Sequence, residues 1–179
     1  MKRLTAIVLA ALMLFTLAAC AGNNATNGNA ETTYEGTLSS LCTKMYETNP
    51  LELMVMTEGA PVDLADADSL KYYLGVEDAA AFKEVIFSET MMGSQAYSLV
   101  LARVADTAKT EELKSSILNG IDTRKWICVE ANQVRVASAA DLIMLVMVDS
   151  SFGETIADDM VEAFKTNVGE LTGETLTKG

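Results

Sequence analysis

The chain has 179 residues, half of them hydrophobic, which is enough for one domain of ordinary size with a substantial core. Its net charge of −12 argues against nucleic acid and anionic lipid head groups as partners, because like charges repel. There is no histidine, so the commonest general base and metal ligand are missing, and we expect neither a metal nor another cofactor.

The N-terminus has the pattern of an export signal. Lys2 and Arg3 form a short positive region, and an apolar run follows from Leu4 to Ala19. The run is shorter than the roughly 20 residues that a membrane-spanning helix needs, and it ends in small residues. These features predict a signal peptide over residues 1–19 rather than a transmembrane anchor.

The run ends in Leu17, Ala18, Ala19 and Cys20, an order that resembles the lipobox of bacterial lipoproteins. The resemblance implies that a signal peptidase recognises the first three residues and that Cys20 carries a diacylglyceryl thioether. We therefore predict export and anchoring to the outer face of the cytoplasmic membrane through this lipid, with ordinary secretion as the alternative. Residues 20–35, rich in Asn, Gly, Thr and Ala, are predicted to be the lipidated cysteine and a flexible tether.

Residues 36–170 are expected to form a single domain, with residues 171–179 as a C-terminal tail. Apolar residues recur from Leu38 to Met45 at steps of three and four, which predicts a first amphipathic helix. The apolar stretch over residues 51–57 is short enough to be a strand.

The aspartates Asp63, Asp66 and Asp68 precede the next predicted helix. They match part of a calcium-binding loop, but Leu70 stands where a further ligand should be. The other interpretation is that an aspartate caps a short helix that runs through Leu70 and ends before a glycine. We favour the helix cap, because it explains the same residues without a metal.

Two pairs of extended runs make up the rest of the predicted sheet, and each pair is expected to form a hairpin. A helix that begins at Thr110 lies between the pairs, and a last helix begins near Gly153. This order indicates an α+β fold with an antiparallel sheet of about four strands, in strand-strand-helix-strand-strand-helix order, with additional N-terminal helices. The runs span residues 83–89, 96–104, 133–138 and 142–148.

The run from Leu142 to Val148 contains no polar residue. Because alternate side chains of a strand point to opposite faces, both faces of this strand should be covered. We expect the helices around residues 38–45 and 70–74 to cover it within the same chain, and a second copy or a partner protein is the alternative.

Residues 38–164 resemble a family of small bacterial lipoproteins whose mature region is known as a domain of unknown function. The resemblance implies a location at the cell surface and no catalytic residues. It is carried by the lipobox, the Asn-rich tether and the segments PVDLADADSLKYYLG, SETMMGSQAYSLVLARV and GIDTRKWICVEANQVRVASAADLIMLVMVDS.

Cys42 and Cys128 are the cysteines that remain once Cys20 is lipidated. A pair of cysteines in an exported protein can form a disulfide. The alternative is two separate buried thiols, because each cysteine lies in an apolar stretch. Neither has a CxxC neighbour, which argues against a redox enzyme.

Other candidate site residues fall into a reactive pair and a contact patch. Ser94 and Lys125 have the side-chain types of a nucleophile and its base, but no serine-hydrolase motif surrounds them, and a turn residue and a solvated charge are the alternative. Met91, Met92 and Trp126 form a candidate contact patch, because methionine adapts to varied partners and tryptophan is frequent at interfaces. Core packing is the alternative for all three.

The combined features predict a binding or assembly accessory at the cell envelope, with the membrane and an envelope protein as candidate partners. No catalytic residue is assigned, and an enzyme is the less favoured class. The alternatives are an envelope hydrolase that uses Ser94 with Lys125 or acidic residues, and a purely structural lipoprotein.

Overall fold

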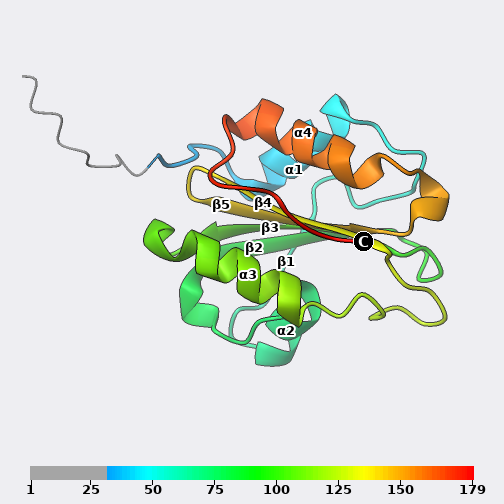
Figure 1. Cartoon of the computed structure of the whole chain (residues 1–179), viewed down its shortest axis with the longest axis horizontal. Helices are drawn as coiled ribbons and strands as arrows, with labels where there is room; N and C mark the ends of the chain where they lie inside the picture. Colours follow the sequence, from blue (N-terminus) through cyan, green and yellow to red (C-terminus); the bar gives the residue numbers. More distant parts are fainter. Residues whose placement is uncertain (1–31) are drawn as a thin grey trace, which may run out of the picture. The chain divides into compact units, whose positions relative to one another are not determined.

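The computed structural model describes residues 32–179 (Figure 1). The predicted signal peptide, the lipobox with Cys20 and residues 21–31 of the predicted tether lie outside the described residues. From residue 32 onward, no helix is both long enough and apolar enough to span a bilayer.

A six-stranded antiparallel sheet in the order β1-β2-β3-β5-β4-β6 organises the described part of the chain. The predicted mixture of helices and an antiparallel sheet is therefore confirmed. The strands are β1 (Ala60–Pro61), β2 (Phe82–Glu89), β3 (Tyr97–Val104), β4 (Gln133–Ala139), β5 (Leu142–Val148) and β6 (Leu176–Lys178). The helices are α1 (Leu38–Thr48), α2 (Ala67–Leu74), α3 (Thr110–Gly120) and α4 (Ile156–Val168).

The prediction of about four strands was too low, because the short strands β1 and β6 extend the sheet at its two edges. β6 lies within residues 171–179, and its Leu176 pairs with Val136 of β4. Lys114 of α3 fixes the segment before β6, since its buried ammonium donates to the backbone oxygen of Glu174 at 2.8 Å. Strands of two or three residues leave no alternating pattern, so the sequence gives no sign of them.

The predicted strand over residues 51–57 was wrong. In this stretch Val55 makes an isolated bridge to Thr90, and no ladder extends from it. The two long hairpins, by contrast, form as predicted, β2 with β3 and β4 with β5. Their alternating or continuous apolar runs are long enough to define a pairing register.

β5 is buried along its whole length and is covered on both faces within the chain, as predicted. One face packs against α1 and α4 and the other against α2 and α3 (Figure 1). The sequence did not indicate which helices would share a face of the sheet. Each face is covered by one helix from the first half of the chain and one from the second half. Leu142, Met144, Val146 and Val148 lie in the first core cluster, and Ile143, Leu145 and Met147 lie in the second.

Asp66 caps the start of α2, and Asp63 stabilises the turn before it. Asp66 accepts a hydrogen bond from the backbone N–H of Asp68 at 3.1 Å, and Asp63 accepts one from Ala65 at 2.9 Å. Gly75 follows the helix with a φ of 72°, the left-handed conformation that glycine adopts most easily. The preferred interpretation, that an aspartate caps a short helix ending before a glycine, is therefore confirmed for Asp66.

Candidate functional site

The register of the strands defines two ends of the sheet. Arg103 pairs with Leu142 at one end, which we call the clamp end, and Tyr97 pairs with Val148 at the other, which we call the loop end. The loop end carries the β2–β3 turn over residues 90–96 and the long loop that precedes β4. Arg103 at the clamp end and Lys125 at the loop end are largely buried cations, and they organise their surroundings in different ways.

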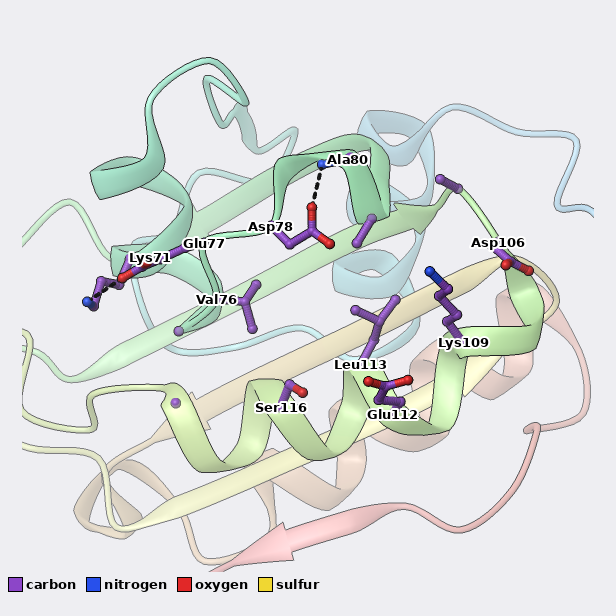
Figure 2. Close-up of a pocket in the computed structure, with 14 residues that line it drawn as sticks. Lys71, Val76, Glu77, Asp78, Ala80, Asp106, Lys109, Glu112, Leu113 and Ser116 are labelled. Atoms are coloured by element: carbon purple, nitrogen blue, oxygen red, sulfur yellow. Dashed lines mark hydrogen bonds and ion pairs between the residues drawn. The ribbon is translucent and has the colours of Figure 1, made fainter.

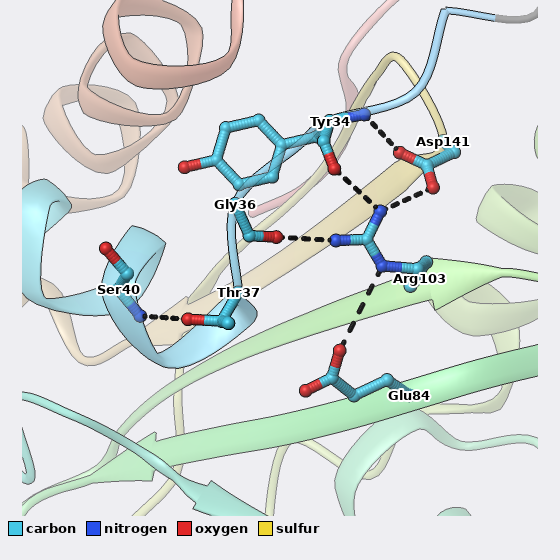
Figure 3. A network of polar contacts seen from close by, with 7 residues as sticks. All are labelled: Tyr34, Gly36, Thr37, Ser40, Glu84, Arg103 and Asp141. Carbon is cyan, nitrogen blue, oxygen red and sulfur yellow. Dashed lines mark hydrogen bonds and ion pairs between the residues drawn. The ribbon is translucent and has the colours of Figure 1, made fainter.

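At the clamp end, Arg103 fixes the point where the chain enters the domain (Figure 3). Its Nη1 donates to Asp141 Oδ2 at 2.6 Å and to the backbone oxygen of Tyr34 at 3.0 Å, and its Nη2 donates to the backbone oxygen of Gly36 at 2.8 Å. The other carboxylate oxygen of Asp141 accepts from the backbone N–H of Tyr34 at 2.8 Å. We call Arg103, Asp141 and the backbone from Tyr34 to Gly36 the clamp.

The planar guanidinium suits this task because it presents several donors in a fixed geometry. Arg103 and Asp141 are largely buried, and Glu84 adds a more exposed carboxylate at 4.0 Å from Arg103 Nε. The clamp was not predicted from the sequence. No local pattern links residues on β3, in the β4–β5 turn and before α1.

At the loop end, the ammonium of Lys125 is buried, so the interpretation of Lys125 as a solvated charge was wrong. Its Nζ lies 2.6 Å from Glu89 Oε1 and donates to Ser98 Oγ at 3.1 Å, and its side chain is 2 % exposed. Three aromatic rings also surround the ammonium, with centroids 4.6, 5.0 and 5.2 Å away, and they belong to Tyr72, Tyr73 and Trp126 respectively. We call these six residues the Lys125 cage.

Burial and the charge of Glu89 have opposite effects on the pKa of Lys125 but act in the same direction on Tyr73. Desolvation lowers the pKa of Lys125, and the neighbouring Glu89 carboxylate partly offsets that effect. Burial, followed by the charge of Glu89, raises the pKa of Tyr73 to about 12. At neutral pH the tyrosine rings of the cage are therefore uncharged.

The structure does not bring Ser94 and Lys125 together as a reactive pair. Ser94 is exposed in the β2–β3 turn, whereas the Lys125 ammonium contacts Ser98, a buried residue of β3. The Ser98 hydroxyl has no exposed surface from which to attack a substrate.

Cys42 and Cys128 are free thiols, so the candidate disulfide between them is absent from the structure. Cys42 is buried in the α1 and α4 core cluster, and this burial raises the pKa of its thiol to about 12. Cys128 is exposed in the long loop before β4, whose Trp126 packs against the opposite core cluster. The sheet separates the two clusters, and the alternative of two buried thiols was right for Cys42 alone.

Large apolar side chains are exposed at the loop end. Met91 and Met92, two residues of the predicted contact patch, are 70 % and 53 % exposed in the β2–β3 turn. Met54 lies beside them, because its backbone oxygen accepts a hydrogen bond from the Met91 N–H at 2.9 Å, and Ile127 projects from the long loop. We call Met54, Met91, Met92 and Ile127 the exposed apolar group.

A cavity of about 470 Å³ opens at the same end of the sheet. Its apolar lining residues are Leu51, Leu53, Phe152 and Ile156, together with Pro50. Trp126, the third residue of the predicted patch, is instead half-buried against the α2 and α3 core cluster. Met54 and Ile127 were missed because isolated apolar residues in loops carry no periodic signal of exposure.

No protein-family model, curated protein or solved structure matched this chain. The resemblance to a lipoprotein family stays a prediction from the sequence.

Proposed function

We propose that the protein is a lipid-anchored extracytoplasmic accessory that binds another envelope protein through its loop end. The anchor rests on the sequence from Lys2 to Cys20, with its positive start, apolar run and lipobox-like end. The single observation that carries the binding role is the exposed apolar group, since large apolar side chains left exposed at one end of a domain are typical of interaction sites.

The position of the clamp supports the loop end as the end of the domain that meets a partner. Tyr34 enters the domain at the clamp end, so the loop end is the end of the sheet farthest from that entry point along the strands. A domain tethered through the Tyr34 segment presents its loop end to partners without obstruction by its own tether.

An apolar protein segment is the partner that fits the loop end best. Methionine side chains are flexible and polarisable and repack against varied surfaces. The nearby cavity, which is lined by both apolar and polar residues, offers room for a further side chain. The net charge of −12 disfavours an anionic membrane surface as the partner of this same end.

Cell fractionation tests the anchor. We expect the native chain in the membrane fraction and Cys20→Ala outside it, because removal of the thiol removes the site of the thioether. Cys128→Ala is the matched control, since it removes an exposed thiol of the domain. A Cys20→Ala chain that stays with the membrane would contradict the lipid anchor.

Photo-crosslinking in intact cells tests the binding role. A benzoylphenylalanine residue at position 91 or 127 should give the same adduct with one exported or membrane protein. The same group at position 83, which is exposed on β2 near the clamp end, should not. Met92→Ser should lower the yield at position 91. Equal adducts at all three positions, or none at 91 and 127, would favour a purely structural lipoprotein.

A further inference from the structure

A second cavity, of about 630 Å³, lies between the end of α2 and the outer side of α3, on the other face of the sheet from α1 and α4 (Figure 2). Its volume is within the range of pockets that bind small molecules. Val76 and Leu113 approach it from opposite walls, and Ala80, Ala81 and Ala105 complete the apolar part of its lining. None of these residues belongs to the clamp, the Lys125 cage or the exposed apolar group.

A close backbone contact closes one end of the cavity. A methyl group added to Gly120 would lie 2.1 Å from the backbone oxygen of Gly75, and one added to Gly75 would lie 2.2 Å from the backbone nitrogen of Ile121. α2 and α3 therefore meet at two glycines, and a larger residue at either position would force the walls apart. This contact fixes the distance between the two walls.

The polar side chains around the cavity carry an excess of negative charge. Glu77 is neutralised by Lys71, whose ammonium lies 2.6 Å away. Asp78 and Asp106 each use one carboxylate oxygen to accept a backbone N–H, from Ala80 at 3.1 Å and from Ala108 at 3.0 Å. Within residues 32–179 the second oxygen of each carboxylate accepts no further hydrogen bond, so it is left for a donor on a ligand.

α3 supplies one more carboxylate and one ammonium to the same space, Glu112 and Lys109. Figure 2 shows the Lys109 side chain extending from α3 toward the wall that carries Asp78 and Val76. Apart from the Lys71–Glu77 pair, three carboxylates and one ammonium line the cavity, which gives a formal charge of −2 (three negative, one positive).

We propose that this cavity binds a small amphiphilic amine, a molecule with an apolar body and a protonated amino group. The apolar body would pack between Val76 and Leu113, and the amino group would donate to Glu112 and to the free oxygen of Asp78. The cavity's negative charge favours a cation over a neutral or anionic molecule of the same shape, because unlike charges attract. This site is independent of the docking role proposed for the loop end.

Three probes with the same six-carbon body separate the contributions of charge and apolar contact. Hexylamine, hexanol and hexanoate are titrated into the purified native chain in lipid nanodiscs, and the methyl signals of Val76 and Leu113 are followed by NMR. We expect hexylamine to shift both signals and to bind about tenfold more tightly than hexanol, with hexanoate weaker still. Equal affinities for the three probes would overturn the proposal. So would hexylamine binding that leaves the methyl signals of Val76 and Leu113 unchanged.

Charge variants give a second and sharper test, because they predict effects of opposite sign. Glu112→Gln should weaken hexylamine binding about fivefold, and Lys109→Met should strengthen it by a similar factor. Glu162→Gln is the matched control, since it removes one exposed carboxylate from α4 on the other side of the sheet and should leave the affinity unchanged. A loss of affinity in Lys109→Met, or an equal loss in Glu162→Gln, would contradict the proposed site.

Discussion

Arg103 and Lys125 are both buried cations paired with a carboxylate, one at each end of the sheet. Arg103 is surrounded by hydrogen-bond acceptors, and two of them are backbone oxygens of the chain that enters the domain. Lys125 has two polar partners and otherwise faces aromatic rings. The clamp thus holds a distant backbone segment in place, whereas the cage holds a loop through its side chains.

Each end also has one residue other than glycine in a strained backbone conformation. Ala140 in the β4–β5 turn has a φ of 52°, and Cys128 in the loop before β4 has a φ of 66°. Residues other than glycine rarely adopt this left-handed conformation, because the Cβ atom approaches the carbonyl oxygen. The hydrogen bonds of Asp141 and the packing of Trp126 lie next to these positions and help to hold them.

Breaking the clamp should have the largest effect. Asp141→Ala leaves the Arg103 guanidinium without its closest partner and the Tyr34 N–H without its acceptor, so we expect a loss of about 4 kcal/mol in the free energy of unfolding. Urea denaturation measures the change. Glu84→Gln removes the more exposed carboxylate at 4.0 Å and should cost under about 1 kcal/mol. Similar losses in both variants would show that the clamp does not depend on its buried pair.

Breaking the Lys125 cage should destabilise the domain less than breaking the clamp. For Lys125→Ala we expect a loss of about 3 kcal/mol in the free energy of unfolding, because Glu89 then keeps its charge in a largely buried position. Removing both charges, as in Lys125→Met with Glu89→Gln, should recover more than half of this loss. The double variant is compared with the single variants by urea denaturation. A double variant as unstable as Lys125→Ala would mean that packing by the lysine stem outweighs the charge pair.

The pH dependence of the free energy of unfolding should distinguish Lys125 from Arg103. Because burial lowers the pKa of Lys125, the unfolded chain binds more protons than the folded one between that lowered value and about 10.5. The native protein should therefore gain stability relative to Lys125→Met as the pH rises through this window. Arginine keeps its proton in proteins, so Arg103→Met should show no such trend relative to the native protein. A difference between the native protein and Lys125→Met that is flat up to pH 10.5 would contradict the desolvation of Lys125.

Relief of backbone strain should give the smallest change in the free energy of unfolding, and it should stabilise the domain rather than destabilise it. We expect Ala140→Gly to stabilise the domain by about 0.5–1 kcal/mol, because glycine adopts a positive φ without the steric penalty. Cys128→Gly should help less, since its exposed loop can relax in other ways. Thermal unfolding of the two variants measures the difference, and destabilisation by Ala140→Gly would show that the turn is not strained.

Local patterns predicted much of the fold. They predicted the hairpins of β2 with β3 and of β4 with β5, the cap of α2 and the glycine that ends α2. Each of these features depends on residues close together in the chain. The lipid anchor also rests on a local order of residue types and stays a prediction. Of the candidate contact patch, Met91 and Met92 are exposed rather than packed in the core, while Trp126 is half-buried.

The long-range features followed from the packed structure alone. Lys125 looks like a surface charge in its own segment, and it is buried because β2, β3 and α2 bring Glu89, Ser98 and two tyrosines around it. Arg103 and Asp141 meet because β3 pairs with β5. The environment of a charge is set by side chains that are distant in sequence. Periodicity and capping, which act over a few residues, therefore identified the helices and hairpins but not the two buried cations that distinguish the ends of the sheet.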